Sequence, residues 1–137
     1  MITLPEYFNN KTAAVTPEIS LNAVDLLKRV NDLLAEFTLA TGKHIPVSLK
    51  TGCNISGDHN GDGGFRLQNS KTGSPFSSHK SGQGVDVADT AAGDIDAFVT
   101  DEILERHDLY RESPGFTHGW CHLSTRKPGS GRRTFTP

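Results

Sequence analysis

One long amphipathic helix constrains this chain more than any other feature of its sequence. Its start is marked by Thr16-Pro17-Glu18, which offers a hydroxyl cap, a proline where no amide partner is needed, and a carboxylate in the first turn. Apolar residues then recur at steps of three and four until Thr41-Gly42, namely at Ile19, Ala23, Leu26, Leu27, Val30, Leu33, Leu34 and Phe37. Such a stripe normally packs on the core of its own domain, so we predict a helix over residues 17–40 that covers a core.

The remaining pattern predicts short strands and a second helix. Apolar and polar residues alternate over residues 45–50, which predicts a strand, and further strands are expected at 85–89, 108–112 and 119–125. Residues 94–106 carry apolar side chains on one helical face. Strands and helices in this arrangement predict a mixed fold.

A chain of 137 residues matches the usual size of one domain. We therefore expect residues 1–137 to form a single α+β domain, in which a small, mainly antiparallel sheet packs against the two helices and carries a cleft on its other face. Residues 1–15 and 126–137 are expected to be an N-terminal arm and a C-terminal tail. The tail is locally basic, and we interpret it as a solvated arm that carries Arg126, Lys127, Arg132 and Arg133.

The densest group of reactive side chains follows a long loop, which the Gly, Asn, Asp and Ser content of residues 51–74 predicts. Compact domains rarely keep such a loop unless it serves a site. Directly after it, His79 and Asp86 stand seven residues apart in the run Ser77-Ser-His-Lys-Ser-Gly-Gln-Gly-Val-Asp86. If Gly82-Gln83 is the two-residue loop of a type II′ hairpin, the histidine and the aspartate pair across it on one face, with β-carbons about 5 Å apart.

A third metal-ligand side chain comes from the run Gly119-Trp-Cys-His-Leu-Ser124. With the period of two of a strand, Trp120, His122 and Ser124 share one face, and the apolar residues between them share the other. Two histidines, one aspartate and an open fourth position are the ligands of a catalytic zinc site, where bound water loses a proton near neutral pH. We predict one zinc ion held by His79, Asp86 and His122, so that the cleft is a zinc cleft.

The two runs resemble the motifs of a known family. The first resembles the SxHxxGxAxD signature of the zinc D-Ala-D-Ala carboxypeptidase family, with Gly84 in place of the usual alanine, and Trp120-x-His122 resembles its second motif. The wider group includes lysostaphin-type enzymes and the hedgehog signalling domain. The resemblance covers residues 45–124 and is greatest to phage and prophage members, which cut peptidoglycan stem peptides. It implies that Ser77 and Trp120 contact the substrate.

The sequence departs from the family at the general base. Many members carry a glutamate a few residues before the last histidine, where this chain has Thr117, His118 and Gly119. Glu112 is the nearest carboxylate upstream, and the turn that follows it could return it to His122. His118 competes for the role because imidazole titrates in the useful range. We favour Glu112.

A second departure concerns the substrate carboxylate. The family often carries an SGYR-like segment whose arginine holds this group, and the matching place here reads Thr51-Gly-Cys-Asn54. Arg66 or Lys50 could take over the role. Alternatively, the enzyme cuts within the stem peptide, as an endopeptidase, and has no terminal carboxylate to bind.

Residues 58–63 match the first half of a calcium-loop pattern, but position twelve is Asn69 in place of the bidentate glutamate. Calcium is therefore a minority hypothesis, because any irregular loop selects Gly, Asn and Asp for its turns. A net charge of −2 gives no field for nucleic acid or a membrane surface. The first residues lack a signal peptide, so we expect the protein to be made in the cytoplasm and to act at the bacterial cell wall after release or delivery. We also expect a monomer.

The sequence thus predicts a zinc peptidase, a carboxypeptidase or endopeptidase, that hydrolyses peptide bonds of peptidoglycan stem peptides. The alternative is a zinc-containing or virion-associated module on the same fold that binds the cell wall without hydrolysis, which the missing glutamate makes plausible.

Overall fold

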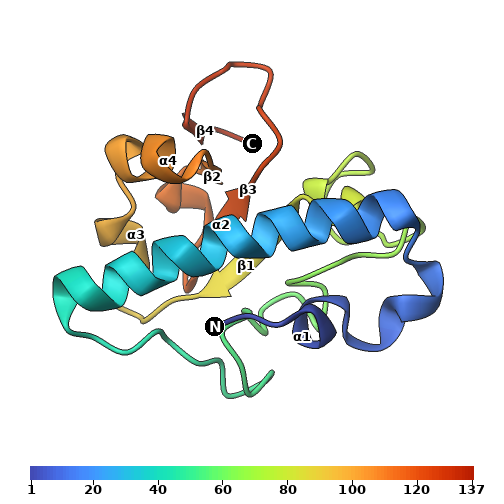
Figure 1. Cartoon of the computed structure of the whole chain (residues 1–137), viewed down its shortest axis with the longest axis horizontal. Helices are drawn as coiled ribbons and strands as arrows, with labels where there is room; N and C mark the ends of the chain where they lie inside the picture. The colour runs from blue at the N-terminus through green and yellow to red at the C-terminus, as the bar shows by residue number, and fades with distance from the viewer.

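The structure, a computed structural model, describes residues 1–137 and has the expected α+β architecture. Four strands form one sheet in the order β1-β3-β2-β4, and only the β2–β4 pair is parallel. The helices lie mainly on one side of the sheet (Figure 1). In chain order the elements are α1 (Leu4–Phe8), η1 (Asn9–Ala14), α2 (Pro17–Thr41), η2 (Ser78–Ser81), β1 (Gly84–Ala88), α3 (Asp94–Phe98), α4 (Asp101–His107), β2 (Tyr110–Glu112), η3 (Pro114–Phe116), β3 (Trp120–Ser124) and β4 (Thr134–Phe135).

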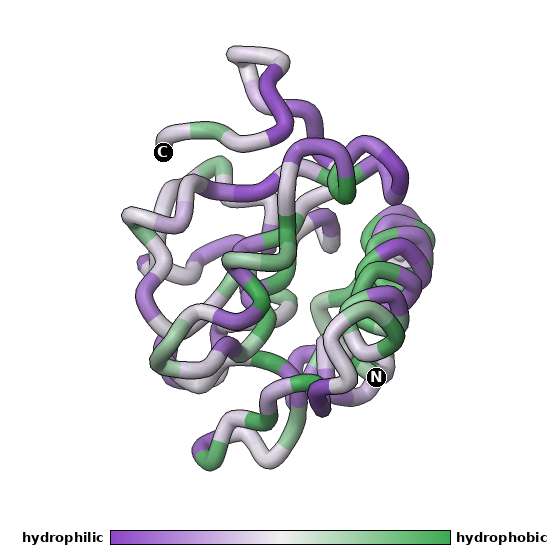
Figure 2. Tube along the Cα trace, turned by 90° about the vertical axis from the view of Figure 1, so that its left-hand side faces the viewer, coloured by the Kyte–Doolittle hydropathy of each residue, from purple (hydrophilic) through white to green (hydrophobic).

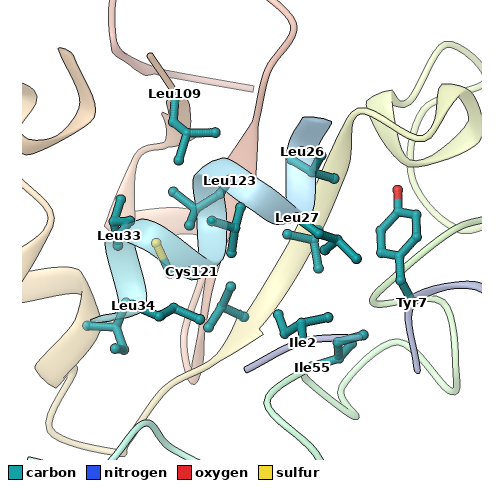
Figure 3. Packing of buried hydrophobic residues seen from close by; sticks show 14 of the residues in the cluster. Ile2, Tyr7, Leu26, Leu27, Leu33, Leu34, Ile55, Leu109, Cys121 and Leu123 are labelled. Carbon is teal, nitrogen blue, oxygen red and sulfur yellow. The ribbon is translucent and has the colours of Figure 1, made fainter. Parts of the chain in front are cut away.

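Helix α2 forms as predicted and crosses the sheet diagonally. The Thr16 hydroxyl accepts a hydrogen bond from the amide of Ile19, and Gly42 ends the helix in the left-handed conformation. The apolar stripe of α2 is buried between the helix and the sheet (Figure 3). Seen nearly end-on, α2 stands to one side of the rest of the chain, and green, hydrophobic residues occur on both (Figure 2). The long helix therefore covers one side of the core, as its periodicity predicts.

Strands β1 and β3 show the alternation that the sequence predicts. Val85 and Val87 from β1 and Cys121 and Leu123 from β3 are fully buried in the core under α2. The residues between them point to the opposite face of the sheet. The apolar half of each strand thus anchors the sheet, and the polar half is free to build a site.

The predicted strand over residues 45–50 is wrong. This segment has no strand partner, and its backbone closes a local turn, with the Ser48 amide donating to the Cys53 carbonyl at 2.9 Å. Of its three alternating apolar side chains, Ile45 packs partly buried against the core, whereas Val47 and Leu49 are 58% and 101% exposed. Alternation whose apolar side chains mostly face solvent does not make a strand.

The predicted helix over residues 94–106 is divided into α3 and α4. Val99 leaves the helical conformation, and the Thr100 hydroxyl accepts a hydrogen bond from the amide of Ile103 and so caps α4. A side-chain cap inside a periodic segment competes with the continuing helix.

The two ends of the chain contribute to the fold. Residues 1–15 form α1 and η1, and Ile2, Tyr7 and Phe8 are buried in the core cluster. The tail returns as β4, where the amide of Ser113 donates to the carbonyl of Phe135 at 2.7 Å. Arg133 lies 4.4 Å from the centre of the Tyr110 ring. The interpretation of the tail as a solvated arm is therefore wrong for residues 133–135.

Candidate metal centre

Three buried side chains converge on one face of the sheet. Asp86 and His122 occupy the middle of β1 and β3 and are direct partners across the antiparallel pair. His79 comes from η2, which precedes β1. The relative exposures of His79, Asp86 and His122 are 2%, 2% and 8%.

The predicted hairpin is wrong, although the residues it was meant to join do meet. Gly82 ends the turn of η2 in the left-handed conformation with φ 77°, and β1 begins only at Gly84. The Ser77 hydroxyl accepts a hydrogen bond from the His79 amide and favours this short helical turn. Asp86 therefore pairs with His122, and His79 approaches from the loop.

The ligand atoms lie at distances that suit a metal ion. His79 Nε2 is 3.2 Å from His122 Nδ1 and 3.3 Å from Asp86 Oδ1, and the last two atoms are 2.9 Å apart. Donors placed tetrahedrally around zinc, with bonds of about 2.0–2.2 Å, would be separated by about 3.3–3.5 Å. The three residues could therefore hold a metal ion.

The outer nitrogen of each imidazole already has a partner. His79 Nδ1 lies 2.7 Å from the carbonyl oxygen of Gly64, which accepts a hydrogen bond from it, and His122 Nε2 lies 3.5 Å from the Ser78 hydroxyl. The tautomer of His79, assigned from this partner, leaves its inner nitrogen with a lone pair, and the inner nitrogen of His122 lies within hydrogen-bond distance of both His79 Nε2 and Asp86 Oδ1. A cation could replace the proton shared among these three atoms, and outer partners of this kind are typical of metal-binding histidines.

The second oxygen of Asp86 is also supported. Oδ2 accepts a hydrogen bond from Arg66 Nη2 at 3.3 Å, and His59 Nδ1 lies 3.0 Å away without good hydrogen-bond alignment. Burial alone would raise the pKa of Asp86, but electrostatic and hydrogen-bond interactions with the surrounding histidines, those of His79 and His122 first, hold it well below its ordinary value. Burial lowers the pKa of His79. Both shifts favour the forms in which these side chains bind metals, an ionised carboxylate and a neutral imidazole.

Close packing of two side chains explains why position 84 is a glycine. A β-carbon on Gly84 would lie 2.3 Å from the Ser78 hydroxyl and 3.1 Å from His122 Cε1. The glycine therefore allows η2 to pack against β1 beside the ligands.

A cavity of about 480 Å³ opens in front of the three ligands. Ser77, Trp120 and Glu112 line it, and their predicted roles toward a substrate stay predictions. Burial raises the pKa of Glu112, the charge of His122 opposes this and that of Asp86 adds to it, and the net direction is upward. His118 is exposed, does not line the cavity, and acts electrostatically on Asp96 instead.

The two proposed carboxylate anchors are not available in this cavity. Arg66 is 5% exposed, and it donates to the backbone carbonyls of Asp62 and Thr72 as well as to Asp86. Lys50 lines a separate cavity. Arg66 thus supports the candidate ligand Asp86, and its guanidinium is occupied by these acceptors and not open for a substrate carboxylate.

The calcium-like loop is organised by protein donors. Asp62 Oδ2 accepts hydrogen bonds from Ser70 and Thr72, both at 2.9 Å, and Oδ1 lies 3.1 Å from the amine of Lys11. No group of carboxylates in this loop gathers around a common centre. The acidic residues hold the loop in shape, which leaves the calcium hypothesis without support.

Several cavity residues were not predicted from the sequence, and His59 and Phe135 are the ones that pack against predicted site residues. His59 packs edge-to-face on Trp120, with ring centres 4.8 Å apart, and Phe135 packs edge-on against the His122 ring at 6.1 Å. Nothing in the local pattern distinguished Phe135. The position of His59 between two aspartate-rich turns was the only signal for that residue.

No protein-family model matches the chain, and comparisons with curated proteins and with solved structures give no significant match. None of the helices combines the length and apolar character needed to span a lipid bilayer. The geometry of the site itself therefore carries the functional argument.

Proposed function

We propose that this protein is a zinc metallopeptidase that hydrolyses peptide bonds of bacterial peptidoglycan stem peptides. The observation that carries the proposal is the convergence of two imidazole nitrogens and one carboxylate oxygen, each oriented by an outer partner, at the base of an open cavity. Two histidines, one carboxylate and a free fourth position favour zinc among the common metals. The family resemblance of the two motifs supports the substrate class.

Zinc, when bound by His79, Asp86 and His122, would activate water and polarise a carbonyl group. Glu112 lines the same cavity, and its raised pKa suits a carboxylate that takes a proton from the attacking water and passes it to the leaving amine. Trp120 and Phe135 are aromatic walls beside His122 that would restrict the substrate. A carboxylate at this place supports hydrolysis over a module that only binds the wall.

The proposal is tested by metal analysis and by digestion of purified sacculi with His122→Ala. We expect one zinc ion per chain and released peptides for the natural protein, with both lost in the variant. His44→Ala is the matched control, because His44 is an exposed histidine outside the cavity. Undiminished hydrolysis by His122→Ala, or a natural protein that binds no zinc, would overturn the proposal.

A further inference from the structure

A second cavity adjoins the cavity in front of the three candidate ligands, which we call the metal cavity. A ridge formed by Phe76 and Arg126 separates the two. The second cavity has a volume of about 510 Å³, and the two cavities share Phe76, Ser77 and Arg126. Its other walls come from the start of α2 and the region of η2 and are mostly polar, with side chains such as Asn22 and Gln83. Each cavity falls within the range of about 300–1,000 Å³ that is typical of ligand sites. A ligand that fills the first could continue into the second.

The ridge between the cavities is an aromatic side chain beside a cation. Phe76 is 84% exposed and contributes nothing to the core. Arg126 Nη2 donates a hydrogen bond to the carbonyl oxygen of Phe76 at 2.5 Å, and the arginine is itself exposed. Aromatic residues and arginine are enriched where proteins bind partners. This pair is therefore suited to contact a ligand that passes over it.

Arg126 is also the only lysine or arginine on the metal cavity with a guanidinium or amine open to solvent. The other cation there, Arg66, is buried and bound to three acceptors. A carboxylate on the substrate can thus be paired at the ridge and not beside Asp86. An arginine in this position can bind a carboxylate through two parallel hydrogen bonds.

We propose that the substrate is an acidic peptide that crosses this ridge, with its reacting bond in the metal cavity, its flanking residues in the second cavity and a carboxylate on Arg126. The inference rests on the proposed hydrolytic function and deepens it. The second cavity extends the site along the substrate chain on one side of the reacting bond, so a peptide that continues beyond this bond is preferred over a short one.

The test uses zinc-loaded full-length protein and three synthetic stem peptides with the same reacting bond. One peptide is confined to the metal cavity, and two extend across the ridge with either a glutamate or a glutamine in the flanking segment. We expect kcat/KM to be about 10–100-fold higher for the extended acidic peptide than for its amide analogue, as for a charged hydrogen bond. Arg126→Gln should lower kcat/KM for the acidic peptide to the value of the amide analogue.

Two further variants separate this role from general effects. Arg132→Gln removes an exposed arginine of the same tail that lines neither cavity, and it should keep the preference for the acidic peptide. Phe76→Ala should lower kcat/KM for the extended peptides more than for the short one. Equal cleavage of the acidic and amide peptides, or of short and extended peptides, would overturn the inference.

If the natural protein cleaves none of the three peptides, the proposed function fails and the inference is decided by binding. Fluorescence anisotropy of the same labelled peptides on the zinc-loaded protein then measures the preference directly. Tighter binding of the extended acidic peptide that is lost in Arg126→Gln supports the ridge crossing, and equal binding of all three excludes it.

Discussion

Two carboxylates near β3 lie in contrasting surroundings. Asp86, on the metal face, is fully buried and surrounded by donors, and its pKa is held well below the ordinary value. Asp96 lies beside Cys121 on the other face, its Oδ1 has no hydrogen-bond partner, and the nearest cation atom, Arg111 Nη1, is 3.9 Å away. Burial and then the charge of Asp89 raise the pKa of Asp96 to about 6. The difference teaches that burial alone opposes ionisation, and that a ring of donors is what prepares a carboxylate to bind a cation.

The largest effect is expected from Asp86→Ala, which removes the stabilised carboxylate of this pair. The substitution leaves the buried guanidinium of Arg66 without its anion, so we expect the free energy of unfolding of the metal-free protein to fall by about 3–5 kcal/mol. Zinc binding should also be lost. Denaturant unfolding and metal analysis measure the two effects, and a variant as stable as the natural protein would show that the donors around Asp86 do not stabilise its charge.

The third carboxylate of this region, Glu112, sharpens the comparison because it lines the cavity without joining the three ligands. Glu112→Gln should lower kcat by about 10²–10⁴-fold, as expected for loss of a general base. Zinc content should stay unchanged, since the ligands are intact. Peptide release from sacculi and metal analysis of the same sample decide the matter, and loss of zinc in this variant would mean that Glu112 is a ligand.

The effect of His59 on Asp86 can be measured by replacing the histidine with either of the two amide side chains, Asn or Gln. Asn places a donor near the position of Nδ1, the atom 3.0 Å from Asp86, whereas Gln places it near that of Nε2. We expect His59→Gln to weaken zinc binding by about 10–100-fold, as for other partners of metal ligands. His59→Asn should retain most of the affinity in isothermal titration calorimetry. Equal weakening by both variants would assign His59 a packing role beside Trp120 only.

The smallest effect is expected at Asp96. Its folded-state pKa lies above the unfolded value of 3.8, so the folded state holds the proton more tightly and stability falls as the pH rises from about 4 to about 6. Asp96→Asn should remove this slope and stabilise the protein at neutral pH by about 1 kcal/mol, after allowance for screening of a half-buried group. Thermal unfolding at a series of pH values measures it, and an unchanged slope in the variant would contradict the assignment.

Much of the fold could be predicted because the relevant signals are local. The caps and apolar period of residues 17–40 predicted α2 almost to its ends, and the alternation in β1 and β3 identified which side chains are buried. The same local reasoning failed for residues 45–50, where two of the three alternating apolar side chains face solvent, and at Thr100, where one hydroxyl caps a new helix. Periodicity indicates which secondary structure a segment can form, and not which part of the protein it will pack against.

In the candidate site, too, some features follow from local sequence and others from tertiary contacts. The sequence alone identified the three candidate ligands and placed Asp86 and His122 on the polar faces of their strands, because side-chain direction in a strand follows from the backbone itself. Only the tertiary structure decided that these two residues pair with each other, that His79 reaches them from a short helical turn, and that Arg66, His59 and Phe135 surround them. Those contacts join residues that are distant along the chain, and their geometry depends on how every buried surface and backbone hydrogen bond is satisfied at once.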